Sequence, residues 1–185
     1  MRNALYRGRC TRMLDKLCCS PEFLIATGRS INKERMKDQY VVLRAIAFLM
    51  LHRGEFKDIP ALQYRGDIDD FLARFMVYVN DNAPEKLIVD YENLFIRCMQ
   101  ISYDLLGENG FRFSGNGIRR PINMPLFEAL SYLFSFVPEK IDYTWASRLI
   151  LDIESVKEEF DDSRYFSGNI DSTTSVSFRF DRMDK

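Results

Sequence analysis

Few residues in this chain of 185 could do chemistry, and the single histidine sets the first limit. A structural zinc site takes four Cys or His ligands, but Cys10, Cys18, Cys19 and Cys98 lack metal-motif spacing. We therefore expect no metal site and interpret the cysteines as reduced thiols of a cytoplasmic protein. A hydrolase triad or an HNH-type nuclease also needs histidine, and His52 is better explained as a polar residue ending a helix.

Paired carboxylates are common, but the pattern places them on helix surfaces. Asp69-Asp70, Glu158-Glu159 and Asp161-Asp162 fall at a predicted helix start or on predicted exposed faces. Acids there complement the helix dipole or keep the face solvated, so we predict no catalytic dyad. The phosphate-binding motifs GxxxxGKS/T and GxGxxG are absent.

One glycine-rich turn is a candidate phosphate contact. Residues 115–120 read GNGIRR, which sets glycines beside Arg119 and Arg120 as in a phosphate-binding turn. The same letters fit a hairpin turn flanked by two solvated arginines, so both interpretations stay open.

Arg44 interrupts the most apolar stretch of the chain. Residues 40–51 read YVVLRAIAFLML, apolar at eleven of twelve positions. An unpaired buried charge is very costly, so Arg44 needs a partner. One reading is a buried ion pair with an acid of another helix or with helix-end carbonyls. The other is an arginine directed at a bound anion or protein partner.

The elements predicted around this stretch are helices. A helix that is apolar all round lies inside a core, so we predict a central helix at 33–52, with Asn32 as its N-cap. It is too short for a bilayer, which takes about 20 apolar residues. Helical spacing, N-caps and prolines predict further helices at 9–19, 21–27, 68–79, 84–106, 121–137, 143–160 and 175–184. We expect one more short segment at residues 163–170, between the last two of these helices.

These elements predict an all-α protein, an irregular multi-helix bundle around a buried central helix. The alternation at 111–118 allows at most one small β-hairpin. We expect residues 1–185 to form one helical domain, with no membrane segment.

The net charge of −1 hides an uneven distribution of charge. Residues 1–66 carry 13 Lys and Arg against 6 Asp and Glu, whereas residues 67–185 carry 13 against 21. The basic third could face phosphate groups. It could equally attract the acidic remainder within one domain, so both readings remain.

Four stretches, taken in order, resemble one known family. They are RNALYRG at 2–8, RMKDQYVVLRAIAF at 35–48, PINMPLFEAL at 121–130 and TTSVSFRF at 173–180. Together they are similar to the C-terminal helical half of the GmrSD-type restriction proteins, which are ParB-like and carry an Asp-Gly-Gln-Gln-Arg motif. The resemblance spans nearly the whole chain.

The resemblance also implies what this sequence lacks. Family members begin with a ParB-like region that bears the motif and binds and hydrolyses nucleotide, and many add an HNH-like nuclease domain. Neither is present, so we expect the C-terminal part of a larger domain, and no catalysis or cofactor for this chain alone. NTP is implied for the full-length family.

The family implies phage defence by nucleotide-dependent restriction of DNA. We expect this chain to be a non-catalytic scaffold and interaction part. It would join a missing ParB-like half or itself through an exposed apolar patch, and contact DNA. Arg2 and Asn3 belong to a segment that the family shares with its nucleotide-binding half, whereas Arg44 and Asn123 match family positions without an assigned role.

The alternative is a stand-alone nucleic-acid-binding helical protein that uses its basic N-terminal third. An independent enzyme is the third and weakest hypothesis. The candidate contacts to nucleotide, phosphate or DNA are Arg2, Asn3, Arg7, Arg44, Arg119 and Arg120.

Overall fold

The computed structural model describes residues 8–31, 36–114, 119–138, 140, 142–161, 163 and 165–184. This part of the chain forms eight α-helices and two short 3-10 helices, and it contains no β-strand. The prediction of an all-α protein is therefore confirmed. The α-helices are α2 (Arg9–Cys18), α3 (Pro21–Ala26), α4 (Lys37–His52), α5 (Ile68–Asp81), α6 (Glu85–Leu106), α7 (Met124–Phe134), α8 (Tyr143–Asp161) and α9 (Thr173–Met183); the 3-10 helices are η2 (Pro60–Leu62) and η3 (Gly107–Asn109).

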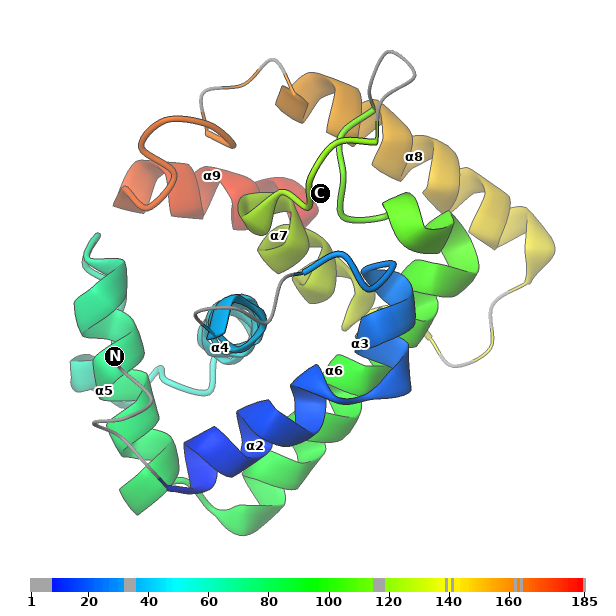
Figure 1. Ribbon diagram of the computed structural model, residues 1–185. Helices are drawn as coiled ribbons and strands as arrows, with labels where there is room; N and C mark the ends of the chain where they lie inside the picture. The colour runs from blue at the N-terminus through cyan, green and yellow to red at the C-terminus, as the bar shows by residue number, and fades with distance from the viewer. Residues whose placement is uncertain are drawn as a thin grey trace.

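Helix α4 is the centre of the molecule. Figure 1 looks along α4, and the other long helices surround it, with α8 on the outside beside α6. Every residue from 41 to 50 is buried, including Arg44. Helix α4 packs against α2, α5, α6 and α7, and Phe48 reaches α9 at Phe180, with 5.7 Å between ring centroids. The predicted buried central helix is confirmed.

Side-chain caps fix where several helices begin. The side chains of Ser20 and Asp67 accept hydrogen bonds from the backbone N–H groups three residues on, as N-cap residues do. Asn123 and Ser172 cap α7 and α9 in the same way. The cap predicted at Asn32 lies outside the described residues.

The predicted start of the central helix is wrong. Met36 has φ 57° and ψ 36°, a left-handed conformation, and α4 begins at Lys37. A residue in that conformation cannot continue a right-handed helix, so the helix cannot run unbroken from residue 33.

Two smaller predictions also need correction. Helical spacing within 143–160 predicts an inward Trp145, but Trp145 is 38% exposed, because α8 lies on the outside of the molecule beside α6. Residues 111–114 are turn and irregular backbone rather than strand, and residues 115–118 of the expected hairpin lie outside the described part.

None of the described helices has the length and apolar content that a bilayer crossing requires. All four cysteines carry free thiols. Burial raises the pKa of both Cys10 and Cys98 to about 12, so these two thiols stay protonated and unreactive at neutral pH.

Candidate functional site

The structure describes three of the six predicted contact residues, and they lie in two separate places. Arg2, Asn3 and Arg7 lie outside the described residues. Arg44 lies in the core, whereas Arg119 and Arg120 line a pocket together. The structure thus separates Arg44 from the two arginines of the glycine-rich turn.

Arg44 takes part in a buried ion-pair cluster. Its Nε donates to Oε1 of Glu128 on α7 at 2.5 Å, and its second terminal nitrogen donates to Asp171 at 2.6 Å. Arg179 on α9 donates to the other carboxylate oxygen, Oε2 of Glu128, at 3.1 Å. The side chains of Arg44 and Glu128 are 1% and 0% exposed. These four residues, two cations and two anions, form the charge cluster.

The charge cluster accounts for both guanidinium groups. Burial lowers the pKa of Arg44, but Glu128 and Asp171 outweigh that effect and raise it overall. For Arg179, burial and the nearby Arg44 lower the pKa, and Glu128 only partly offsets this. Arginine stays protonated in proteins, so the cluster is neutral overall. The structural interpretation of Arg44, a buried pair with an acid of another helix, is confirmed.

A basic pocket lies between the end of α3, the start of α4 and the segment that leads into α7. Its volume is about 360 Å³, and four cations line it: Lys37, Arg112, Arg119 and Arg120. The remaining lining is mostly apolar, including Val41, Ile122 and Met124. We refer to this site as the basic pocket. It brings together the two predicted arginines and two cations that the sequence did not single out.

Arg112 is the most recessed cation of the basic pocket, with 4% exposure. It donates only to neutral oxygens: the carbonyls of Thr27, Glu108 and Arg120 and the hydroxyl of Ser30. Burial, and then the nearby Arg119, lower its pKa, while Glu108 opposes them. Its charge therefore lacks a direct carboxylate partner among the described residues.

Arg119 and Arg120 each hold one carboxylate at the edge of the pocket. Arg119 donates to Oε2 of Glu108 at 2.9 Å, and Arg120 pairs with Asp161 at the end of α8. Gly28 lies close to the first pair: a Cβ there would come within 2.2 Å of Arg119 and 2.7 Å of Glu108. The absence of a side chain after α3 is what lets Arg119 approach.

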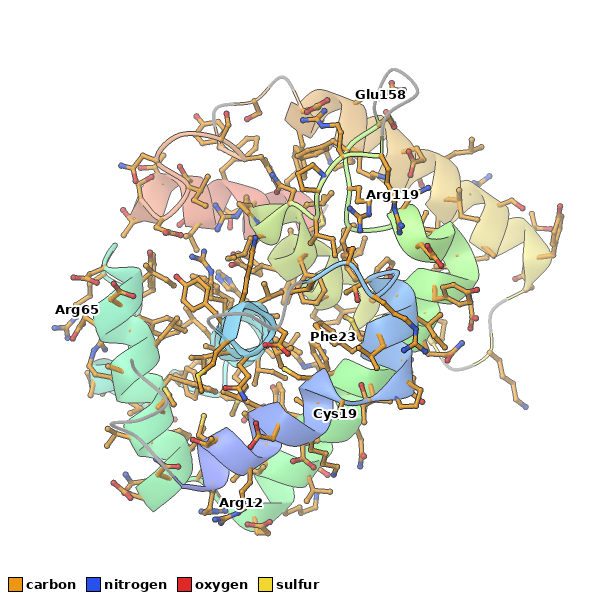
Figure 2. The ribbon with its side chains drawn as sticks, in the orientation of Figure 1. Arg12, Cys19, Phe23, Arg65, Arg119 and Glu158 are labelled. Atoms are coloured by element: carbon orange, nitrogen blue, oxygen red, sulfur yellow. The ribbon has the colours of Figure 1, made fainter. Side chains whose placement is uncertain are left out.

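Among the described residues, two cations of the basic third are paired with carboxylates of the acidic remainder. Arg9 pairs with Glu85 at 2.6 Å and Lys16 with Glu92 at 2.5 Å, so the basic third binds the acidic remainder. Figure 2 shows Arg12 and Arg65 on different edges of the molecule. This arrangement favours attraction within one domain over a basic face.

His52 ends α4, as predicted, but its ring packs inward. It stacks on Phe180 with 3.6 Å between ring centroids and an interplanar angle of 9°, and Tyr132 meets it edge-on. Nε2 is buried without a hydrogen-bond partner in the described part of the chain. Burial lowers the pKa of His52 to about 4, with Asp184 raising it and Arg179 lowering it. His52 is thus a neutral packing residue at pH 7.

Sequence reasoning missed Arg112, Glu128 and Arg179, because the local pattern around each residue does not indicate its role. Arg112 lies between Phe111 and Phe113, and a strand there would place Arg112 on the face opposite the two phenylalanines. In the structure all three side chains are buried. Glu128 and Arg179 lie in the stretches 121–130 and 173–180, and the helical pattern gave no sign that they are buried. Among the described residues, no group of three or more His, Cys, Asp or Glu could hold a metal ion.

The fold and the two charged sites define an all-α multi-helix protein with a buried charge cluster and a basic pocket. Comparisons with protein-family models, curated proteins and solved structures find no match for this chain.

Proposed function

We propose that this chain is the non-catalytic helical scaffold of a GmrSD-type, nucleotide-dependent DNA restriction protein that acts in phage defence in the cytoplasm. The positions of the resembling stretches in the fold support this proposal. The stretch at 35–48 includes most of α4, the stretch at 121–130 includes most of α7, and the stretch at 173–180 lies in α9. They are far apart in sequence, yet these helices pack together in the core.

The single observation that carries the proposal is the charge cluster. Arg44, Glu128 and Arg179 each come from a different resembling stretch, and all three are buried. In this proposal, the three stretches serve a common packing role in the core rather than a surface chemistry. Asn123, another matching position, caps α7 and also donates to the Phe166 carbonyl at 3.2 Å.

In this proposal, nucleotide hydrolysis and DNA cleavage belong to the ParB-like region and the nuclease of the family. This scaffold contributes a surface on which the ParB-like region docks. Apolar residues that remain exposed on and before α8 are candidates for that contact: Phe136 is 56%, Tyr143 88% and Leu151 71% exposed. Exposed apolar side chains mark interaction sites when they form a patch, and self-association through the same residues is the competing use.

The test begins with the coding DNA upstream of Met1. The proposal expects an in-frame or frameshifted stretch that encodes Asp-Gly-Gln-Gln-Arg. That region is then produced separately, mixed with this chain, and assayed for complex formation and NTP hydrolysis. Hydrolysis should need the ParB-like region and should disappear when the motif aspartate is changed to asparagine. Hydrolysis by this chain alone, or an unrelated upstream gene, would contradict the proposal.

The second candidate is a stand-alone nucleic-acid-binding protein; the four cations of the basic pocket are the observation in its favour, and the exposed carboxylates of Glu108 and Asp161 beside them oppose it. Such binding weakens with salt, with a slope of about −0.9 per neutralised phosphate on double-stranded DNA. The pairs Arg9–Glu85 and Lys16–Glu92 already occupy cations of the basic third, so the scaffold proposal expects at most a shallow slope. A steep slope would favour the second candidate.

A further inference from the structure

We propose that the basic pocket binds a small organic phosphate, with the phosphate against its cations and the organic group against its apolar wall. This inference goes beyond the scaffold function and does not depend on it.

The charge of the pocket is the first argument. Four cations line it, and the carboxylates that pair with them are Glu108 on Arg119 and Asp161 on Arg120. Arg112 donates only to neutral oxygens, and Lys37 is exposed at the first position of α4. Among the described residues, two positive charges of the pocket are therefore left without a carboxylate, which matches the charge of a phosphate monoester near neutral pH.

The recessed position of Arg112 is the second argument. A buried cation is costly unless an anion compensates it. Neutral oxygens hold its guanidinium in place, and these four hydrogen bonds leave one of its five N–H groups without a partner among the described residues. A guanidinium fixed in this way keeps its positive charge beside the pocket, where a bound phosphate would compensate it.

The volume and the apolar lining of the pocket indicate which organic group the phosphate carries. The pocket holds about 360 Å³, near the lower end of the range for small-molecule sites. Val41, Ile122 and Met124 offer apolar contact beside the cations. Inorganic phosphate alone would leave this wall uncovered, so an ester with an apolar or flat group fits better.

The surroundings oppose a nucleic-acid backbone. The Glu108 side chain is 53% exposed and that of Asp161 is 30% exposed at the edge of the pocket. Helix α8, which ends at Asp161, also carries exposed Glu158 and Glu159 in its last turn, and Figure 2 labels Glu158 on that helix. A polyanion would bring further phosphates against these carboxylates, whereas one phosphate would not.

Isothermal titration calorimetry of the full chain tests the proposal with named probes: phenyl phosphate, adenosine monophosphate, inorganic phosphate, adenosine and a short single-stranded oligonucleotide. At least one of the two phosphate monoesters should bind with saturation, more tightly than inorganic phosphate and adenosine. Lys37→Glu should weaken that binding by about tenfold or more. Lys57→Glu makes the same charge change at an exposed lysine outside the pocket and should leave binding unchanged.

Arg112→Met should abolish binding, and circular dichroism and thermal unfolding show whether this variant folds. If it does not fold, the Lys37→Glu and Lys57→Glu pair carries the test alone. Three results would overturn the proposal: no saturable binding of either ester at millimolar concentration, equal weakening by both lysine variants, or tighter binding of the oligonucleotide than of either ester.

Discussion

Arg44 on α4 and Glu128 on α7 are 84 positions apart in the chain, yet they form a buried ion pair with 2.5 Å between Nε and Oε1. Glu128 uses its second oxygen for Arg179. One carboxylate therefore joins three helices, and it faces two buried cations at once. The stability of the core should depend on this carboxylate more than on any surface charge.

Replacing Glu128 by alanine should lower the free energy of unfolding by about 3–5 kcal/mol, because two buried guanidinium groups lose their shared carboxylate. Urea unfolding followed by circular dichroism measures the loss. Asp90→Asn is a matched control, because Asp90 pairs with Lys86 on the exposed face of α6, and it should cost about 0.5 kcal/mol or less.

A triple variant separates charge from shape. Arg44→Met, Glu128→Leu and Arg179→Met together remove both buried cations and their shared anion, and Asp171, whose side chain is 28% exposed, can remain solvated. Apolar replacement of a whole buried ionic cluster is often neutral or stabilising, so the triple variant should recover most of the stability lost in Glu128→Ala. A triple variant less stable than Glu128→Ala would show that the ionic contacts themselves hold the core.

Asn123 should show a graded response. Its side-chain oxygen accepts from the Leu126 amide at 2.9 Å, and its amide nitrogen donates to the Phe166 carbonyl. Asn123→Ala loses both bonds and should cost about 1–2 kcal/mol in chemical unfolding. Asn123→Asp keeps the cap and should cost less; equal losses in the two variants would refute the capping role.

Protonation of His52 should make the protein less stable as the pH is lowered. Its pKa is about 6.5 in an unfolded chain and about 4 in the folded protein, where burial disfavours the charged ring. The folded pKa is the lower one, so the unfolded state binds the proton more readily between these values. The free energy of unfolding should therefore drop by about 2–3 kcal/mol as pH falls from about 6.5 to about 4.

His52→Phe isolates this contribution from the titrating carboxylates. The new ring can still stack on Phe180, but it takes no proton. Unfolding curves recorded at several pH values should be flatter for the variant than for the parent protein. Parallel curves would mean that His52 titrates normally in the folded state.

Trp145 is the only tryptophan of the chain and is 38% exposed on α8, so it reports on docking at that helix. Its fluorescence should be red-shifted and readily quenched by acrylamide. If the proposed ParB-like region docks on α8, emission should shift to the blue and quenching should decrease. Leu151→Lys should reduce both changes, because it puts a charge on the same helix. If gel filtration shows a complex but the emission is unchanged, the ParB-like region docks on a surface other than α8.

The helical architecture follows from local signals in the sequence. Ser20-Pro21 and Asp67 start α3 and α5 where the capping rules place them, because an N-cap depends on a few adjacent residues. The left-handed Met36 has no such signal, since non-glycine residues rarely adopt that conformation. The buried central helix was predictable from its unbroken apolar pattern.

The sites were less predictable because they are assembled from distant segments. The sequence indicates that Arg44 needs a partner, but the helical pattern did not distinguish Glu128 from a surface acid. Arg119 and Arg120 were found through adjacent glycines. Arg112 and Lys37 join them only through the packing of α3 and α4 against the segment before α7, which no local pattern encodes.

The charge cluster also constrains the order in which a newly synthesised chain can fold. Arg44 and Asp171 are 127 positions apart, and synthesis proceeds at about 5–20 residues per second. For several seconds the nascent chain therefore holds Arg44 without Asp171 and Arg179, which arrive only with the loop before α9 and with α9 itself. The central helix can collapse early, but its charge cannot be fully compensated until these last segments leave the ribosome.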